Sequence, residues 1–366
     1  MTSWKAPLAA AAALLLAAGL ASPASAATRG DFRPVPLPFF WPNNYLYDVD
    51  AASPDSVWIT GTQGAQFIIT GPTTGITIPG NPVVRRWKDN AWVEYDLQNA
   101  SRHATITDVD AVGPEDVWIN GEKTHDSGLR TPYVAHFTGS SFTQVELPES
   151  SWEGASLRAA ASGVWLTTAD DFYRRTGDTW THIATKPDVY EHRSYIRADD
   201  DIWVIGAASM LETDLLARHW DGQSWHSVPM EQPAAPAPTI TDVLALSPTD
   251  AWAIGYSWST TPDTPVMTHW DGTAWTNVAL PAGFNELTKI VQGADGTLWA
   301  LGHLIDEPAK PGLLRYSGGT WEKVPTTAVP NRSNVYASAL AVVPGTGALW
   351  TLGSVNIGGP VVLTDG

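Results

Sequence analysis

The hydrophobic positions of this chain fall in short runs. The runs are rich in Val, Ile, Thr and Trp and are separated by turns of Gly, Pro, Asp and Ser. In one stretch they are Ile240–Ala245, Ala251–Gly255, Val266–Trp270 and Trp275–Leu280. Runs of this length and composition predict strands. Because no helical periodicity occurs beyond residue 26, the pattern predicts an all-β protein.

One unit of this pattern repeats seven times. Its first half is a turn, an apolar residue, a tryptophan and usually a glycine, with the tryptophans at Trp58, Trp118, Trp165, Trp203, Trp252, Trp299 and Trp350. The spacings are 60, 47, 38, 49, 47 and 51 residues. Its second half places two aromatic residues around a turn and ends at Trp92, Phe142, Trp180, Trp225, Trp275 and Trp321. Four strands in about 40–50 residues make one β-propeller blade, so we predict a seven-bladed β-propeller of four-stranded blades.

The two ends of the repeat region complement each other. Residues 360–366 align with the third strand of a unit, and no fourth strand follows them. Residues 31–38 align with the missing fourth strand. We therefore expect the N-terminal strand to complete the last blade and close the ring, which leaves no open sheet edge. An open solenoid would instead need capping repeats.

Residues 1–26 have the pattern of a secretory signal peptide. Lys5 precedes a run of small and apolar residues up to Ala21, and small residues around Ala24 and Ala26 form a cleavage site. A membrane anchor is the alternative, but the run is shorter than the ~20 residues that span a bilayer, and Pro23 follows it. The sequence thus predicts a secreted, extracellular protein whose single propeller domain covers residues 27–366.

The charge and composition of the chain exclude several classes of partner and cofactor. The chain has 38 acidic and 21 basic residues, a formal net charge of −17, so we expect neither a nucleic acid nor an anionic membrane as a partner. It has no cysteine, which excludes a disulfide, a thiolate nucleophile and cysteine-ligated zinc. No Asp-rich turn has the spacing of a calcium loop, and no ligand spacing links the loop histidines. We expect a monomer without a metal ion or other cofactor.

Residues repeated once per blade have two interpretations. The repeated tryptophans could stack on sugars, but aromatic side chains at every blade are more simply the core between neighbouring sheets. The position before the third-strand aromatic is basic in six units, as Arg86, His136, Arg174, His219, His269 and Arg315. Such a ring could bind an acidic ligand. We favour the simpler interpretation, that these side chains hydrogen-bond to the neighbouring blade.

The repeat resembles known propellers. The D-V-W-x-x-G and H-W-D-G-x-x-W units resemble repeats of secreted bacterial seven-bladed propellers of the kelch and galactose-oxidase-like group. H-W-D-G-x-x-W is also similar to the W-D-G-x-x-W repeat of propeller lectins, and this resemblance implies sugar pockets between blades. The chain lacks the kelch glycine doublet and the terminal W-x-x-L-G-G of those lectins. Without cysteine it cannot hold the copper and tyrosine-cysteine cofactor of galactose oxidase.

Departures from the repeat are the candidates for function. Trp41, Trp152 and Trp258 lie outside the repeat, in connections that share one rim of a propeller. With Tyr190 and Tyr256 they form our predicted ligand-binding set. Aromatic rings flanked by acids suit a sugar or a basic peptide, although the loops could simply pack on the blade ends. We therefore expect a non-catalytic module that binds a polysaccharide or an extracellular protein.

Two alternatives remain open. A carbohydrate-active hydrolase or lyase needs two carboxyl groups about 5–9 Å apart, and the pairs to test come from Glu149, Glu153 and Glu191. No G-x-S-x-G or H-E-x-x-H motif offers other chemistry. The second alternative is a scaffold that docks a partner protein by its sides, which an exposed apolar flank away from the rim would favour.

Overall fold

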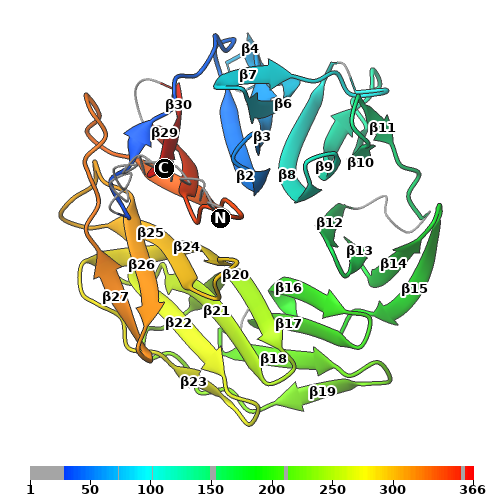
Figure 1. The fold of residues 1–366 in the computed structure, drawn as a ribbon. Helices are drawn as coiled ribbons and strands as arrows, with labels where there is room; N and C mark the ends of the chain where they lie inside the picture. The colour runs from blue at the N-terminus through cyan, green and yellow to red at the C-terminus, as the bar shows by residue number, and fades with distance from the viewer. Residues whose placement is uncertain (1–28, 73, 101, 149–153, 210–212, 356–358) are drawn as a thin grey trace, which may run out of the picture.

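The chain forms a closed ring of sheets. The computed structural model describes residues 29–366 apart from residues 73, 101, 149–153, 210–212 and 356–358. Within these residues, seven four-stranded antiparallel sheets surround a central channel (Figure 1), which confirms the predicted seven-bladed β-propeller. No helix in the described part is long and apolar enough to cross a bilayer. The predicted signal peptide lies outside the described residues.

Each blade runs from an inner strand at the channel to an outer strand at the surface. In that order, blade 1 contains β2 (Tyr45–Ser53), β3 (Ser56–Gln63), β6 (Asn81–Lys88) and β7 (Ala91–Glu94); blade 2 contains β8 (Ala104–Gly113), β9 (Asp116–Thr124), β10 (Arg130–Phe137) and β11 (Phe142–Gln144). Blade 3 contains β12 (Ala155–Ala160), β13 (Gly163–Thr168), β14 (Asp171–Thr176) and β15 (Thr179–Thr185); blade 4 contains β16 (Tyr190–Ala198), β17 (Asp201–Ala207), β18 (Leu215–Trp220) and β19 (Trp225–Val228). Blade 5 contains β20 (Pro238–Ser247), β21 (Asp250–Ser257), β22 (Thr264–Trp270) and β23 (Trp275–Asn277); blade 6 contains β24 (Phe284–Gln292), β25 (Leu298–Leu304), β26 (Gly312–Ser317) and β27 (Thr320–Val324). Blade 7 contains β28 (Tyr336–Val342), β29 (Leu349–Val355), β30 (Gly359–Thr364) and β1 (Arg33–Pro34).

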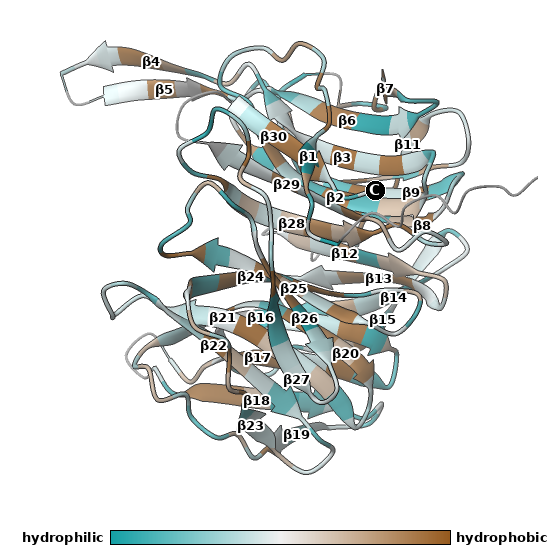
Figure 2. Ribbon diagram, turned by 60° about the vertical axis from the view of Figure 1, so that its left-hand side comes forward, coloured by the Kyte–Doolittle hydropathy of each residue, from teal (hydrophilic) through white to brown (hydrophobic). Residues whose placement is uncertain are grey.

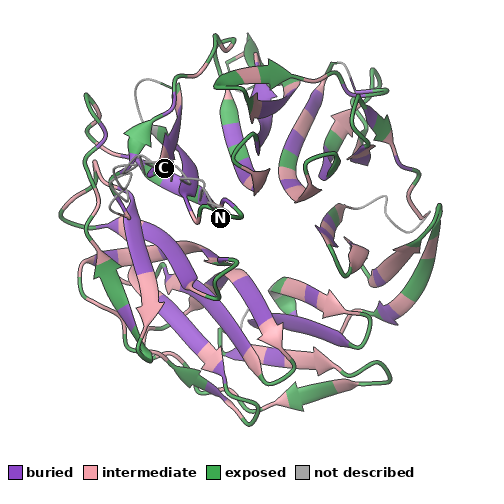
Figure 3. Cartoon of the chain, viewed as in Figure 1, coloured by how far each residue is buried: buried purple, intermediate pink, exposed green. Residues whose placement is uncertain are grey.

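Antiparallel order gives the ring two different rims. Connections from the second to the third strand of a blade, and from the fourth strand to the next blade, lie on one side, which we call the loop rim. The tight turns between the first and second and between the third and fourth strands lie on the other side, the turn rim. Burial is greatest in the second strands, as in β3, whereas outer strands such as β15 and β19 are largely exposed (Figure 3).

The N-terminal strand closes the ring as predicted. β1 pairs antiparallel with β30, with Arg33 opposite Thr364 and Pro34 opposite Leu363. Next to this pair the carboxylate of Asp365, which is fully buried, accepts hydrogen bonds from the backbone N–H groups of Gly30, at 3.1 Å, and Leu349, at 2.7 Å. One side chain therefore joins the first described residues to the last blade.

We expect Asp365→Asn to lower the free energy of unfolding by about 2 kcal/mol, because an amide nitrogen would face a buried N–H donor in place of a carboxylate oxygen. Urea denaturation of the purified protein measures the change. Asp89→Asn, in an exposed turn of blade 1, is the matched control and should change stability by less than about 0.5 kcal/mol. Equal stability of the two variants would contradict the closing role of Asp365.

The repeated tryptophans are the core between blades, as the sequence indicated. All seven second-strand tryptophans are buried. Trp203 of blade 4 lies 5.2 Å from Trp270 and 5.3 Å from Trp275 of blade 5, measured between ring centroids. Trp58 packs on blade 2 and Trp350 on blade 1 in the same way. Each of these second-strand tryptophans thus wedges against the outer aromatic pair of the next blade.

The repeated basic residues are only partly as predicted. His136, His219 and His269 stack on the second-strand tryptophans, with ring centroids 3.9–4.2 Å apart. Each histidine hydrogen-bonds to an aspartate of its own blade, so the prediction of bonds to the neighbouring blade is wrong for the histidines. The reason is that this aspartate starts the second strand, directly beside the third. Arg86 and Arg174, with longer side chains, do reach carboxylates of the next blade. Arg315 instead bonds to Glu322 of its own blade, so the prediction is also wrong for this residue.

A hairpin that the sequence pattern did not suggest extends from blade 1. β4 (Gln66–Gly71) and β5 (Thr74–Ile78) pair with each other in a separate two-stranded sheet on the loop rim. Figure 2 shows this hairpin projecting beyond the blades. It lies within the 60-residue spacing between Trp58 and Trp118, so the insertion accounts for the longest interval in the repeat.

Candidate functional site

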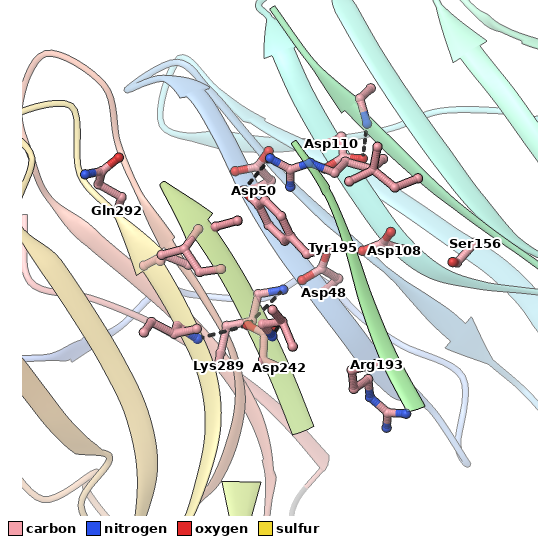
Figure 4. Close-up of a pocket in the computed structure, with 18 of the residues that line it drawn as sticks. Asp48, Asp50, Asp108, Asp110, Ser156, Arg193, Tyr195, Asp242, Lys289 and Gln292 are labelled. Atoms are coloured by element: carbon pink, nitrogen blue, oxygen red, sulfur yellow. Dashed lines mark hydrogen bonds and ion pairs between the residues drawn. The ribbon is translucent and has the colours of Figure 1, made fainter. Parts of the chain in front are cut away.

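A cavity with a mixed charged lining occupies the central channel and has a volume of about 710 Å³. The first strand of every blade contributes to it. Figure 4 labels lining residues from blades 1 to 6. Ten of its polar residues lie at two registers of these strands. Nearer the loop rim are Asp48, Asp108, Ser156, Arg193, Asp242 and Lys289, and two residues further along are Asp50, Asp110, Arg158 and Tyr195.

Channel aspartates join each blade to the next. Asp50 accepts a hydrogen bond from the Ala111 backbone N–H at 2.7 Å, and Asp110 accepts one from Ala159 at 2.7 Å. Asp48 and Asp242 bind the N–H groups of Val109 and Ile290 in the same way. A first strand has a sheet neighbour on one side only, so these carboxylates satisfy donors on its open edge.

The channel also changes the acidity of these groups. Burial raises the pKa of Asp50 to about 6, against an ordinary value of 3.8. Burial, and then the nearby Asp108, raise the pKa values of Asp48 and Asp110 well above the usual range. The carboxylate of Asp242, 3.8 Å from the Lys289 ammonium, raises the pKa of that lysine. The channel therefore holds carboxyl groups that keep their protons to a higher pH than an exposed aspartate does.

Two cations of the channel, Arg158 and Lys289, have an aromatic and a carboxylate partner respectively. The guanidinium of Arg158 lies 3.9 Å from the centre of the Tyr195 ring, and its Nη2 donates to the tyrosine hydroxyl at 2.5 Å. Burial raises the pKa of Tyr195, which stays a neutral acceptor. These contacts and the aspartate bonds link blades 1 to 4 in series and blade 5 to blade 6. We therefore assign the channel a structural role, and the loop rim is the better candidate for ligand binding.

Exposed apolar side chains gather on the loop rim. Among the described residues fourteen large hydrophobic side chains are exposed, and all except Val93 lie on this rim or on its hairpin: Phe39, Trp41, Tyr45, Tyr47, Phe67, Ile68, Ile69, Ile76, Leu129, Tyr190, Trp258, Ile305 and Tyr336. Scattered exposed hydrophobics are ordinary, but their restriction to one face indicates an interaction surface.

The structure places the predicted residues in separate parts of this rim. Trp41, 59% exposed, lies before β2 with its ring 5.6 Å from Phe39. Trp258, 63% exposed, follows β21, where Tyr256 is half-buried. Tyr190, 37% exposed, begins β16 of the adjacent blade. The rim thus has one aromatic group at blade 1 and another at blades 4 and 5.

The remaining predicted residues fall where the structure gives no side chains. Glu149, Trp152 and Glu153 lie outside the described residues, and Glu191 has a described backbone in β16 only. The predicted carboxylate pair of a glycosidase therefore stays a prediction. In the part of the chain that the structure describes, no three His, Asp or Glu side chains gather so that they could hold a metal ion.

Known proteins resemble this chain in fold. No protein-family model and no curated protein sequence matches it. The β-propeller domain of the Trilobed protease from Pyrococcus furiosus superposes with a TM-score of 0.53 at 12% identity, covering 89% of this chain and 95% of that one. The GH74 xyloglucanase from Xanthomonas campestris gives 0.52 at 13% identity, and this chain, 89% of which is covered, spans about half (54%) of the enzyme. At these identities the likeness shows the propeller fold. The archaeal domain has an open velcro topology, whereas β1 and β30 close the present ring.

Proposed function

We propose that this protein is a secreted, non-catalytic binding module that holds a polysaccharide across its loop rim. The observation that supports this proposal is the restriction of exposed hydrophobic side chains to that rim, with Val93 the one exception among the described residues. The net charge of −17 opposes self-association through this surface, because two copies of the chain repel each other. The apolar side chains still offer contacts to a neutral or polar ligand.

The kind of side chain favours a sugar. Trp41, Tyr45, Tyr190, Trp258 and Tyr336 present aromatic rings, which cover the apolar faces of pyranose rings while their polar atoms hydrogen-bond to hydroxyls. These residues come from blades 1, 4, 5 and 7. A ligand that contacts several of them must extend across the channel mouth, and a polymer meets that requirement better than a monosaccharide.

The test is binding of residues 27–366 to a panel of soluble and insoluble glycans, with released reducing sugars measured in the same samples. We expect binding without release. Trp41→Ala and Trp258→Ala should each weaken it by about tenfold or more, because each removes a stacking contact. Val93→Ala, which removes an exposed apolar side chain away from the rim, should leave affinity within about twofold.

Two results would count against this function. If binding is unchanged after Trp41, Trp152 and Trp258 are all replaced by alanine, the loop rim is excluded as the binding surface. Release of sugars that is abolished by Glu149→Gln, Glu153→Gln or Glu191→Gln would instead make the protein a carbohydrate-active enzyme.

A further inference from the structure

A second cavity opens on the loop rim at the boundary between blades 3 and 4. Its volume is about 450 Å³. Ser156 and Thr167 of blade 3 line one side, and Arg193 and Ser194 of blade 4 line the other, with Lys186 from the connection between β15 and β16. The four residues from the strands also line the channel, so the two cavities adjoin. We call this cavity the basic groove.

The groove exists because blade 3 departs from the repeat. In all six other blades a glycine stands three residues after the second-strand tryptophan: Gly61, Gly121, Gly206, Gly255, Gly302 and Gly353. A Cβ at five of them, Gly61, Gly121, Gly255, Gly302 and Gly353, would lie 1.9–2.4 Å from a carbonyl oxygen of the first strand, which bulges toward them. Blade 3 has Thr168 there, and β12 pairs with β13 without a bulge.

Blade 3 also has the shortest connection between its second and third strands on this rim. Only residues 169 and 170 connect β13 to β14, whereas blades 1, 2, 5 and 6 have longer connections at the same place. This matches the shortest interval of the repeat, 38 residues between Trp165 and Trp203. Among the residues that the structure describes, the loop-rim end of the boundary between blades 3 and 4 is therefore left open.

Two cationic residues, Lys186 and Arg193, line the groove of an otherwise acidic protein. The Arg193 Nε donates to the Thr241 carbonyl oxygen of blade 5 at 3.2 Å, which fixes the position of the guanidinium. Burial lowers the pKa of Lys186 although the carboxylates of Asp170 and Asp171 act in the opposite direction. The neighbouring carboxylates thus do not fully compensate for the partial burial of this ammonium group, and an added anion would stabilise it.

Hydroxyl groups surround the cations. Ser156 and Thr167 lie opposite each other in the β12–β13 pair, so their Cβ atoms are about 5 Å apart. Together with Ser194 they present three hydroxyls, and none of these has a hydrogen-bond partner among the residues that the structure describes. Hydroxyls next to two cations suit an oxyanion attached to a polyhydroxylated molecule.

We propose that the basic groove binds the oxyanion of an acidic sugar residue, a uronate carboxylate or a sulfate ester. Lys186 and Arg193 pair with the oxyanion, while Ser156, Thr167 and Ser194 hydrogen-bond to it or to the sugar hydroxyls. The inference rests on the proposed function and narrows its ligand to an acidic polysaccharide that crosses the rim near Tyr190.

The experiment uses three probes of equal length: oligogalacturonate, its methyl ester and a sulfated neutral oligosaccharide. Calorimetric titration of residues 27–366 should show that at least one of the two charged probes binds about tenfold or more tightly than the ester. Lys186→Gln should remove that preference and Lys186→Arg should retain it to within about threefold. Lys123→Gln makes the same change of net charge on the loop-rim end of β9, outside the groove, and should leave affinity within about twofold.

The outcomes separate this inference from the proposed function. Stronger binding of the carboxylate or of the sulfate probe identifies the oxyanion. The inference is overturned if the ester and both charged probes bind equally, or if Lys186→Gln and Lys123→Gln have equal effects. In that case Trp41 and Trp258 remain sugar contacts, provided that their replacement still weakens binding. Absence of binding to these probes and to the whole glycan panel overturns both.

Discussion

Trp58→Ala should lower the free energy of unfolding by about 3–5 kcal/mol, the loss expected for a large buried aromatic side chain. Trp58 is fully buried, and its ring lies 5.1 Å from Phe137 and 5.7 Å from Phe142 of blade 2. Its Nε1 also donates to the Ser56 hydroxyl at 2.9 Å. Truncation would open a cavity between two blades and leave that hydroxyl without its donor.

Chemical denaturation followed by tryptophan fluorescence measures this loss. Trp41→Ala is the matched control, because it removes the same side chain from a site that is 59% exposed, and we expect less than about 1 kcal/mol there. A similar loss in the two variants would mean that the repeated tryptophans do not hold the blades together.

Asp50→Asn should change how stability depends on pH. The folded state keeps the Asp50 proton up to about pH 6, whereas the unfolded chain releases it near 3.8. Folding therefore takes up a proton between these values, so the contribution of Asp50 to stability is greatest below about pH 4 and falls as pH rises to 6. Asparagine does not titrate, and the variant lacks this decline.

The expected size of this effect follows from the shift. Between pH 4 and pH 7, the free energy of unfolding of Asp50→Asn should rise by about 2 kcal/mol relative to that of the wild type. This is somewhat less than the pKa shift implies, because Asp50 keeps partial exposure to the channel. Unfolding titrations at several pH values test this. Asp55→Asn, in an exposed turn, serves as the control; a parallel pH dependence in both variants would show that Asp50 titrates normally.

The repeat made the ring predictable from sequence. A tryptophan that must wedge between two sheets recurs once per blade, and the unmatched strands at the two ends require each other. The hairpin β4–β5 was missed because it belongs to no repeat, although the absence of charged residues from 56 to 84 and the long spacing were visible signals.

The channel and the basic groove were harder to predict. Asp-Val-Asp-Ala occurs at both 48–51 and 108–111, which is a signal for channel-facing carboxylates. Which side chains meet there depends on bulges in the first strands, and a bulge shifts the register without a change of composition. Thr168 in place of glycine was readable in the sequence. Its consequence, an open boundary beside Lys186 and Arg193, required the register of β12 and β13.

Closure of the ring by β1 also determines on which side of the molecule a tag or linker can be attached. Arg29 lies against Asp365 and the Thr346 carbonyl oxygen, so the first and last described residues lie together at the turn rim. An affinity tag, a linker to a solid support or another domain joined at either end would leave from the side opposite to Trp41, Trp258 and the basic groove. Immobilisation through the C-terminus thus presents the proposed binding face to solution in a single orientation.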